Sequence, residues 1–479
     1  MRRPQGGCGR GRITQIAPAG FVIQRLGGGF ANPPRASESW KAVKSYYVYY
    51  GEEKYPFEIP PGWTVLKNAV SSEEAAPSLT IPEMVEKALA APISSPRLSE
   101  IVHEDSKVAL IVDDWARSTP VSQILPTLLE ELQAGGARSE NIDIVVALGT
   151  HRAMPREALA ERLGEAIFQQ YRVSQHDCQA EGLVPIGRLS TGGEARINPV
   201  VARADVKIGV GSIVPHPMNG FGGGAKIIMP GVSSFEAVKE HHLHFTPQPG
   251  CYIGNLETNP FYHEVCQVAE MAQLTFIVNC VYNPREEVVD VVAGHLREAH
   301  LAGIERSKEN YAFRLDEPAD VTITSAYPYV EGPQTIKPII PASLLATKRG
   351  GSVIIVVTCR DGMPEPLLAA FDAIYSRHPE HTGRLAVDTF KSSQLFVEGA
   401  IDFNCAIFYA LVCAARNSIT MVSRDLDERS VTRLGFRYAS SLEKAIERES
   451  RVRPQATVNI FPIGGVVLPL TQEAPNLCE

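Results

Sequence analysis

The hydrophobic pattern divides most of the chain into buried strands and amphipathic helices. In the first half, four mainly apolar runs without polar alternation predict strands that are buried on both faces. These runs are Lys107–Val112, Asn141–Leu148, Val206–Val214 and Leu274–Cys280. Helices are predicted between them, at Val121–Ala134, Pro155–Leu163 and Phe235–His244. Strands and helices that alternate in this way indicate a parallel sheet covered on both faces.

The pattern restarts after Pro318 and predicts a second sheet. Its expected strands are Val321–Ser325, Ser352–Thr358, Ser418–Val422, Thr457–Phe461 and Val466–Leu470. Its expected helices are Glu365–Tyr375, Thr389–Leu395, Ala406–Arg416 and Leu442–Glu447. The elements expected before the first sheet are a hairpin (Tyr46–Tyr50 with Phe57–Ile59), a strand (Thr64–Lys67) and a helix (Ile81–Ala91). The sequence therefore predicts an α/β protein of two domains, each with a mostly parallel sheet flanked by helices, and an active site in the cleft between them.

The composition is that of an ordinary globular enzyme. Of the 479 residues, 44% are hydrophobic and 21% are charged, and the formal net charge is −8. A negative charge argues against nucleic acid as a partner, because domains that bind nucleic acid are usually basic. No apolar run approaches the roughly 20 residues that a membrane helix needs. The nine cysteines are scattered without a Cys-x-x-Cys pair, which is typical of reduced thiols in a cytoplasmic protein.

Residues 1–42 differ in composition from the rest of the chain. They contain seven basic residues, eight glycines and a single acid, Glu38. A segment of this kind has too few apolar residues to bury a core, so we expect a disordered, basic, glycine-rich tail. The strand pattern begins near Val43, and translation from a valine-type start codon there would give a chain without the tail.

Ionisable side chains follow three predicted strands of the first sheet. Asp114 and Arg117 come after the first strand, His151 after the second and His216 after the third. Because ligands bind beyond the carboxyl ends of the strands in open α/β sheets, we expect these side chains to face one crevice. Simpler explanations exist for three of them: Asp114 as a helix cap, Arg117 as a surface charge and His151 as a structural histidine.

A glycine-rich loop follows the third of these strands. Four of the five residues from Gly220 to Gly224 are glycine, and Lys226 stands two positions later. Glycine has no Cβ, so the backbone there can approach a bound ligand closely. The residues on either side of the lysine do not match a P-loop, and the third glycine of a dinucleotide fingerprint is missing. We therefore expect a ligand site of another kind, with the pair His241-His242 nearby.

Taken together, these motifs resemble the nickel-dependent lactate racemase family. The matching elements are Asp114-x-x-Arg117, Gly149-Thr150-His151-Arg152, Pro215-His216, Gly220-Phe221-Gly222-Gly223-Gly224-x-Lys226, Pro230-Gly231, His242, and Tyr327-Pro328 with Gln334-x-x-Lys337. Their order and their intervals both fit, and the resemblance extends from about Val43 to Leu470. The chain departs from the family's usual motifs at Ala116-Arg117-Ser118 and at His241, where an asparagine is common.

The resemblance implies a cofactor and the residues that hold it. The family uses a nickel-pincer nucleotide (pyridinium-3,5-bisthiocarboxylic acid mononucleotide nickel) that is tethered to a lysine through a thioamide. By this resemblance Lys226 would carry the cofactor covalently, and His242 would complete the coordination of nickel. The other cofactor-binding residues would be Asp114, Gly222, Gly223 and Gly224.

The resemblance also implies a reaction. The family racemises or epimerises 2-hydroxy acids by moving the α-hydrogen to and from the cofactor as hydride, and the expected substrate is lactate or a related short-chain hydroxy acid. His151 and His216 would be the catalytic acid and base, one for each enantiomer, and histidine suits both roles because its unperturbed pKa is about 6.5. Arg117, Gln334 and Lys337 would bind the substrate, whose carboxylate fits the arginine fork.

The domain organisation is expected to follow the family as well. Residues 43–306 would form the N-terminal cofactor-binding and catalytic domain, and residues 314–450 the C-terminal α/β domain. Residues 455–472 would return to the first domain. The expected partners are the 2-hydroxy acid and the proteins that synthesise the cofactor, with no nucleic acid and no membrane, in the cytoplasm.

Two other classes of protein stay open. His241, His242 and His244 could bind a metal in a hydrolase or lyase, although adjacent histidines do not share one helical face. Alternatively, the chain could be a catalytically inactive homologue that handles the cofactor, although His151 and His216 are both present. Metal content together with an ultraviolet–visible spectrum would separate these classes.

Removal of residues 1–42 should leave the enzyme unchanged, because a segment of this composition has no core to contribute. We expect the truncated chain to keep the melting temperature and the catalytic rate of the full chain, measured side by side by thermal unfolding and activity assay. A large loss of either would show that these residues pack on the rest of the protein.

Overall fold

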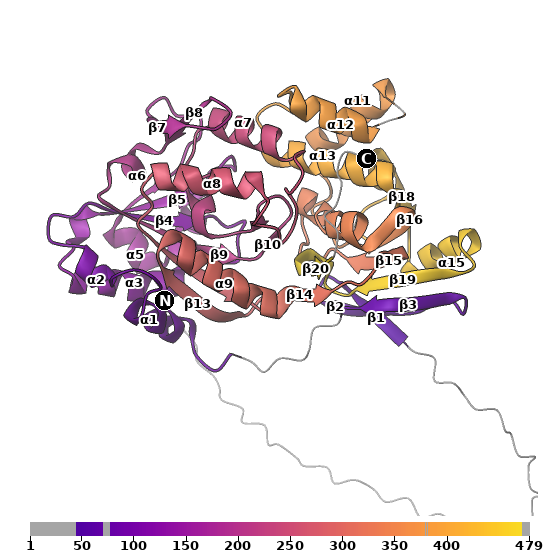
Figure 1. Ribbon diagram of the computed structural model, residues 1–479, viewed down its shortest axis with the longest axis horizontal. Coiled ribbons are helices and arrows are strands. Elements are labelled where there is room, and N and C mark those ends of the chain that lie inside the picture. Colours follow the sequence, from indigo (N-terminus) through magenta and orange to yellow (C-terminus); the bar gives the residue numbers. More distant parts are fainter. Residues whose placement is uncertain (1–44, 70–76, 379, 381, 472–479) are drawn as a thin grey trace, which may run out of the picture. The chain divides into compact units, whose positions relative to one another are not determined.

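The computed structural model describes residues 45–69, 77–378, 380 and 382–471. The predicted tail of residues 1–42 lies outside these ranges. Within them the chain forms two six-stranded sheets and four two-stranded ones, with helices packed on the large sheets (Figure 1). The α/β fold class with two mostly parallel sheets flanked by helices is therefore confirmed. No helix in the described ranges is long and apolar enough to cross a bilayer.

The first sheet has the strand order β13-β12-β9-β4-β5-β6. Its strands are β4 (Val108–Asp113), β5 (Ile142–Ala147), β6 (Arg172–Gln175), β9 (Val206–Ile213), β12 (Phe276–Tyr282) and β13 (Val288–Gly294). Neighbours pair in parallel except β13, which runs antiparallel to β12. The chain moves outward from β4 to β5 and β6, and then crosses back to place β9 on the other side of β4. The strand order therefore reverses between β4 and β9, which is where such sheets open a crevice.

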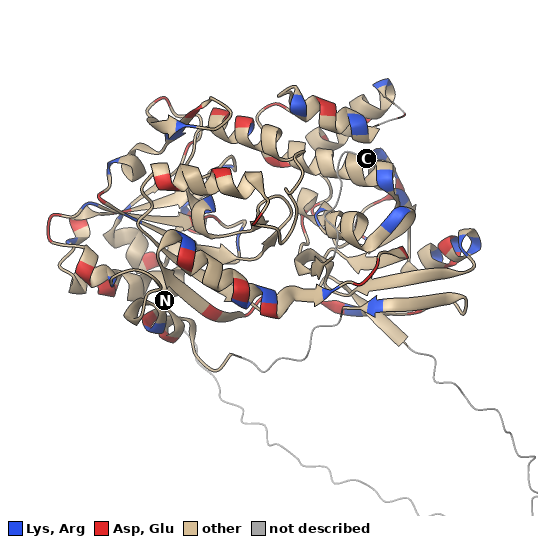
Figure 2. Cartoon of the chain, in the orientation of Figure 1, with Lys and Arg blue, Asp and Glu red and all other residues tan. Residues whose placement is uncertain are grey.

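Both faces of the first sheet are covered, because successive side chains of a strand point to opposite faces. In β4, Leu110 and Ile111 are fully buried in two different cores. The core of Leu110 includes α1 (Ile81–Ala90), α3 (Val121–Ala134) and α4 (Arg156–Leu163). The core of Ile111 includes α6 (Pro199–Arg203), α7 (Phe235–Phe245) and α8 (Pro260–Met271). Charged residues lie mainly on the helices and loops, while the strands carry few (Figure 2).

The second sheet has the order β18-β17-β16-β15-β19-β3 and is parallel throughout. Its strands are β3 (Trp63–Asn68), β15 (Ala319–Ser325), β16 (Thr347–Val356), β17 (Ser418–Val422), β18 (Arg437–Ala439) and β19 (Ala456–Phe461). One face packs on α11 (Glu365–Arg377), α12 (Thr382–Lys391) and α13 (Ile401–Arg416). The other packs on α15 (Leu442–Val452) and on the hairpin β1 (Ser45–Tyr50) and β2 (Glu53–Glu58). Here the strand order reverses between β15 and β19.

One hydrophobic core runs from the first sheet to the second. Val145 of β5, Leu243 of α7, Phe408 of α13 and Ile355 of β16 all belong to it. Helix α7 contacts both α12 and α13. The described residues therefore pack as one compact unit, although they contain two sheets.

Strand pairing differs from the predicted domain ranges in two places. β3, from the predicted first domain, is the edge strand of the second sheet and lies beside β19 (Figure 1). The segment 455–472 is divided: β19 belongs to the second sheet, and only β20 (Leu468–Leu470) pairs with β14 (Ala312–Arg314). A parallel edge strand is held by backbone hydrogen bonds to a distant partner, so the sequence near it gives no signal of where it pairs.

Several elements were not predicted from periodicity. The larger ones are α8, α9 (Leu296–Tyr311), β13 and the hairpin β7 (Val184–Arg188) with β8 (Glu194–Ile197). The smaller ones are α2 (Leu98–Ile101), α5 (Glu165–Gln170), α6, α10 (Ile339–Pro341), α14 (Glu428–Arg433), β6, β10 (Pro215–His216), β11 (Gly220–Phe221), β14 and β18. Helix α9 is rich in charged residues along its length, so its apolar face is narrow and its periodicity is weak. The expected helix at residues 389–395 begins earlier, as α12.

Candidate active site

One cavity of about 610 Å³ lies at the carboxyl ends of strands from both sheets. Loops after β4, β5 and β9 form the part that we call the first wall, and the segment after β15 together with α13 forms the second wall. All eleven residues predicted for the site line this cavity. They are Asp114, Arg117, His151, His216, Gly222, Gly223, Gly224, Lys226, His242, Gln334 and Lys337. The structure thus brings the predicted side chains together, while their individual roles stay predictions.

Asp114 and His151 form a hydrogen-bonded pair on the first wall. Nδ1 of His151 lies 2.7 Å from Oδ2 of Asp114, and the N–H of Ala116 donates to Oδ1 over 3.3 Å. Asp114 is buried and its ionised carboxylate can only accept, so Nδ1 carries the proton of the neutral ring. Nε2 of His151 is then left with a lone pair, as a base requires. Asp114 therefore does not cap the following helix, which begins at Val121 after Pro120: one of its oxygens holds this loop and the other holds His151.

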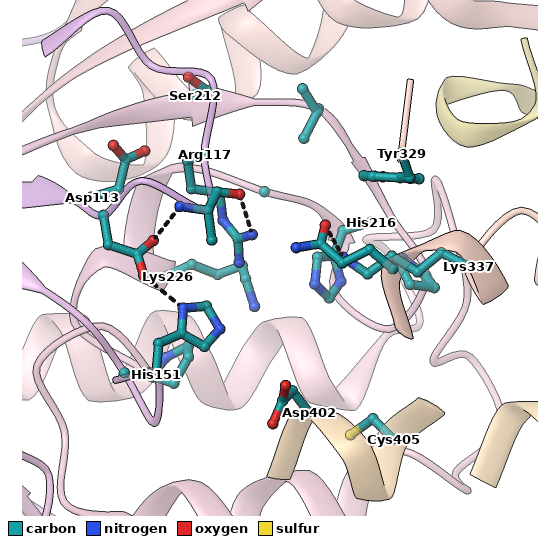
Figure 3. A pocket seen from close by; sticks show the side chains of 18 of the residues that line it. Asp113, Arg117, His151, Ser212, His216, Lys226, Tyr329, Lys337, Asp402 and Cys405 are labelled. Atoms are coloured by element: carbon teal, nitrogen blue, oxygen red, sulfur yellow. Dashed lines mark hydrogen bonds and ion pairs between the residues drawn. The ribbon is translucent and has the colours of Figure 1, made fainter. Parts of the chain in front are cut away.

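Three cationic side chains face the cavity. Arg117 and Lys226 come from the first wall and Lys337 from the second (Figure 3). Burial, followed by the charge of Arg117, lowers the pKa of Lys226 to about 7 and that of Lys337 to about 7. Asp402 and Cys405 on α13 oppose the shift at Lys337 without cancelling it. The cavity is therefore suited to an anion such as a carboxylate or a phosphate.

His216 has surroundings unlike those of His151. Figure 3 shows it beside Lys337, with His151 on the far side of Arg117 in this view. Burial, followed by the charges of Lys226 and Lys337, holds the pKa of His216 well below its usual value. Its Nδ1 accepts hydrogen bonds from two backbone amides, those of Met218 and Asn219. The ring is therefore neutral, and no carboxylate is hydrogen-bonded to Nδ1.

Conformation and packing require glycine at Gly223 and Gly224 of the glycine loop, as they do at Gly220. Gly223 and Gly224 have φ angles of +75° and +53°, which residues with a Cβ rarely adopt. A Cβ on Gly223 would lie 2.9 Å from Oδ1 of Asn279, and one on Gly224 would lie 2.6 Å from the ring of His300. Asn279 also accepts a hydrogen bond from the N–H of Gly224, and Nε2 of His300 donates to the carbonyl of Gly222. These contacts fix the loop that presents Lys226, whatever the loop binds.

The paired histidines of α7 divide into one that faces the cavity and one that does not. Nδ1 of His242 donates to the carbonyl of Val238 over 3.0 Å, which leaves Nε2 with its lone pair, and His242 lines the cavity. Burial lowers the pKa of His242 to about 3, so the ring is neutral as a metal ligand must be. Nε2 of His241 instead lies 3.3 Å from the carbonyl of Phe261, and His241 is fully buried. His244 points outward on the exposed side of the helix.

Gln334 and Lys337 lie on the second wall, in and just after a 3₁₀ turn at Gly332–Ile336. Their predicted common face is present, since Nζ of Lys337 donates to Oε1 of Gln334 over 3.4 Å. This contact turns the amide oxygen of Gln334 toward the lysine, so its NH₂ group is left to donate to another partner. Tyr327, at the start of this segment, stacks on Tyr49 of β1 with the ring centroids 5.0 Å apart.

Arg162 on α4 is a supporting residue that sequence reasoning missed. Its Nε donates to the carbonyl of Asp113, its Nη1 to the carbonyl of Arg117, and its Nη2 to the carboxylate of Asp113. The other oxygen of this carboxylate accepts from Thr119, which also contacts Ser212. Arg162 thus clamps both ends of the loop that carries Asp114 and Arg117. Most of its contacts are with main-chain carbonyls, which leave no pattern in the sequence.

Asn279 also supports the site, and the sequence contains a pattern from which this residue could have been identified. It is a polar residue in the middle of a strand whose other residues are mostly apolar, and it is only 2% exposed. Buried amides are hydrogen-bonded in native proteins, so a partner was to be expected. Its neighbour on the adjacent strand is Gly211, and its amide reaches the glycine loop from there.

Comparison with known proteins finds similarity to lactate racemases in sequence and in fold. The family description "Lactate racemase N-terminal domain" matches residues 50–254. The chain is 31% identical over 321 residues to the lactate racemase of Thermoanaerobacterium thermosaccharolyticum, which covers 66% of this chain and 74% of that protein. It is 28% identical over 401 residues to the lactate racemase of Lactiplantibacillus plantarum, which covers 81% of this chain and 90% of that protein.

Solved structures agree with these matches. The lactate racemase apoprotein from T. thermosaccharolyticum superimposes with a TM-score of 0.79 at 28% identity, over 90% of this chain and 100% of that one. A protein from Thermotoga maritima superimposes with a TM-score of 0.55 at 18% identity, over 84% of this chain and 100% of that one. The second likeness concerns the fold alone.

Replacement of Arg162 by methionine should destabilise the protein in a pH-dependent way. Burial raises the pKa of Asp113 to about 6 even though Arg162 opposes the shift. Without the guanidinium this pKa rises further, so the ionised carboxylate costs more stability as the pH rises above about 6. We expect a loss of about 3–5 kcal/mol near pH 8, as for other broken buried ion pairs, and a smaller loss near pH 5, where the carboxyl group is largely protonated.

Arg172→Met is the matched control. Arg172 pairs with Asp143 at the surface, where the two side chains are 63% and 29% exposed, so its removal should cost less than about 1 kcal/mol at either pH. Denaturant unfolding at the two pH values measures both variants. Equal losses in the two variants, or a loss at Arg162 that does not change with pH, would contradict the assignment.

Proposed function

The chain belongs to the lactate racemase family, and on that premise we propose that it is a racemase or epimerase of a short-chain 2-hydroxy acid that works with the family's nickel-pincer nucleotide. One observation carries the proposal. A histidine–aspartate pair, three cationic side chains and an imidazole with a free nitrogen converge on a single cavity. This set provides a base, a site for a carboxylate and a possible metal ligand within one enclosed volume.

The residues present fit the family's cofactor. Lys226 has a pKa of about 7, so part of its amine is neutral at neutral pH and able to form an amide-like bond. His242 donates Nδ1–H to a carbonyl, as metal-bound histidines commonly do, and keeps Nε2 for nickel. We propose that Lys226 carries the cofactor through a thioamide and that His242 holds the metal, with the glycine loop and Asp114 beside them. Proteins that synthesise the cofactor would supply it.

When bound, the nickel-pincer nucleotide would supply an electrophilic carbon suited to accepting hydride. Arg117 and Lys337 supply the positive charges for the substrate carboxylate, and the NH₂ group of Gln334 donates to a substrate oxygen. Nε2 of His151 accepts the hydroxyl proton as the hydroxy acid becomes an oxo acid, and returns it when the hydroxy acid is formed again. Asp114 keeps His151 in the required tautomer and stabilises its protonated form.

The two alternatives have less support. In the described part of the chain, no group of three or more histidine, cysteine, aspartate and glutamate side chains is placed to hold a metal ion. His241 is turned toward Phe261 and His244 outward, so the three histidines do not converge as a hydrolase site would need. An inactive homologue would not need a base that is as well oriented as His151.

Racemisation should keep the α-hydrogen. The chain, produced together with the proteins that make the cofactor, should interconvert the enantiomers of at least one acid in a panel of 2-hydroxy acids. In heavy water the product should contain no deuterium at the α-carbon, because a hydrogen that moves with its electron pair does not exchange with solvent, whereas a proton on histidine does. Chiral chromatography and mass spectrometry measure the two results.

The same chain produced without those proteins is the control and should be inactive. Extensive deuterium incorporation would refute transfer of the hydrogen with its electron pair, even if racemisation occurs. Absence of activity on every acid of the panel, in a sample that carries the cofactor, would refute the proposed activity.

His242 and His241 offer a matched test of the metal ligand. His242→Ala should remove most of the nickel from cofactor-loaded protein, because its Nε2 faces the cavity, while His241→Ala should keep most of it. Both residues are buried, so thermal unfolding checks that the two variants are folded to a similar degree. Elemental analysis gives the nickel content per chain. The opposite ranking would show that the choice within the pair is wrong.

A further inference from the structure

Two backbone amides point at the same nitrogen of His216. The N–H of Met218 donates to Nδ1 over 3.2 Å, and the N–H of Asn219 donates to it over 3.1 Å. An amide N–H can only donate, so Nδ1 must supply its lone pair to both. In the neutral ring the single proton is therefore on Nε2, the nitrogen on the far side of the ring from these amides.

A flip of the His216 ring that exchanges the positions of its two nitrogens would be unfavourable in free energy. A half-turn of the ring would place a carbon against the amides of Met218 and Asn219, and each unsatisfied donor costs about 1–3 kcal/mol. Protonation of Nδ1 would place its N–H directly against two other N–H groups. Burial and the positive charge of Lys337 disfavour the imidazolium as well. Geometry and charge thus agree that His216 stays neutral with its proton on Nε2.

His151 has the opposite arrangement. Its Nδ1 faces the carboxylate of Asp114, so the proton is on Nδ1 and the lone pair is on Nε2. The carboxylate also stabilises the ring once Nε2 has taken a second proton. The two histidines therefore present different groups to the cavity. His151 presents a hydrogen-bond acceptor, the lone pair of its Nε2, and His216 presents a donor, its Nε2–H.

We infer, on the basis of the proposed function, that His216 is a neutral hydrogen-bond donor to a substrate oxygen and that His151 alone of the two exchanges the hydroxyl proton. This differs from the equal roles expected from the sequence. The hydroxyl O–H bond breaks as the Nε2–H bond of His151 forms, and the reverse happens when the hydroxy acid is formed again. The α-hydrogen leaves and returns with its electron pair, so no proton or electron is gained overall.

One proton-transfer group can serve both enantiomers because the oxo acid is planar at its central carbon. A half-turn about its C=O axis presents the other face and leaves the oxygen next to His151. The carboxylate then moves to a different position, and the cavity offers it more than one cation, with Arg117 on the first wall and Lys337 on the second. A hydrogen bond from the Nε2–H of His216 would stabilise the substrate oxygen most strongly when that oxygen carries negative charge.

Nitrogen NMR tests this inference without any assay of activity. The full-length chain, labelled with ¹⁵N at its 12 histidines, should show a His216 ring with hydrogen on Nε2 and none on Nδ1 at the pH of the activity assay. The spectrum of His216→Asn identifies the signal. A His216 ring protonated at Nδ1, whether as the other tautomer or as imidazolium, would overturn the inference.

Substitutions at the two histidines provide the second measurement. His151→Gln should lower kcat by about 10²–10⁴-fold, because glutamine cannot exchange protons. His216→Gln keeps an N–H donor near the position of Nε2 and should lower kcat by less than about tenfold, whereas His216→Asn keeps only an acceptor for the two amides and should lower it by about 10²–10³-fold. Equal, near-complete losses in His216→Gln and His216→Asn, in protein that unfolds like the parent, would contradict the inference.

The failure of this inference can be told apart from the failure of the proposed function. If the parent chain racemises no 2-hydroxy acid, the function fails, and the NMR result still decides the state of His216. If racemisation occurs and His216 is protonated at Nδ1, the function stands and His216 returns to the role of an acid–base group.

Discussion

Two reversals of strand order determine where the site lies. In the first sheet the order reverses between β4 and β9, and in the second between β15 and β19. At such a point the loops leave the sheet in opposite directions and open a crevice at the carboxyl edge. The first reversal supplies Asp114, Arg117 and His216, and the segment after β15 supplies Lys337. The hydrophobic core common to both sheets holds these two sources of side chains around one cavity.

The buried cationic side chains that suit the cavity to its ligand also reduce the stability of the fold. Lys226 and Lys337 are enclosed next to Arg117, and burial, followed by the charge of Arg117, lowers the pKa of both lysines to about 7. Polar groups that are buried without a partner cost free energy unless a ligand compensates them. An anionic ligand would remove that cost, so binding of an acid and stability of the fold should be linked. The apolar contacts of α7, α12 and α13 offset part of this cost.

The sequence was informative where a residue follows a buried strand and less so where it supports such a residue from a distance. Strand ends placed Asp114, His151 and His216 in one cavity, because parallel strands present their carboxyl ends on one edge. Arg162 escaped notice because it acts through main-chain carbonyls from a helix 45 residues beyond Arg117. The pairing of β3 with β19 was also missed, since backbone hydrogen bonds do not depend on side-chain type. The difference between His151 and His216 depends on which group faces Nδ1, and spacing along the chain contains no such information.

The position of β3 has a consequence for how the protein folds during its synthesis on the ribosome. Trp63 of β3 pairs with Ala456 of β19, which is synthesised roughly 390 residues later. At typical rates of synthesis this delay is on the order of tens of seconds. During that time the apolar side chains of Val48, Phe57 and Trp63 have no finished sheet to cover, because the strand between β3 and β15 does not yet exist. The second sheet therefore takes its strands from both ends of the described chain, and in a nascent chain the earliest strands lack their partner until β19 is made, after the last α-helix of the described chain.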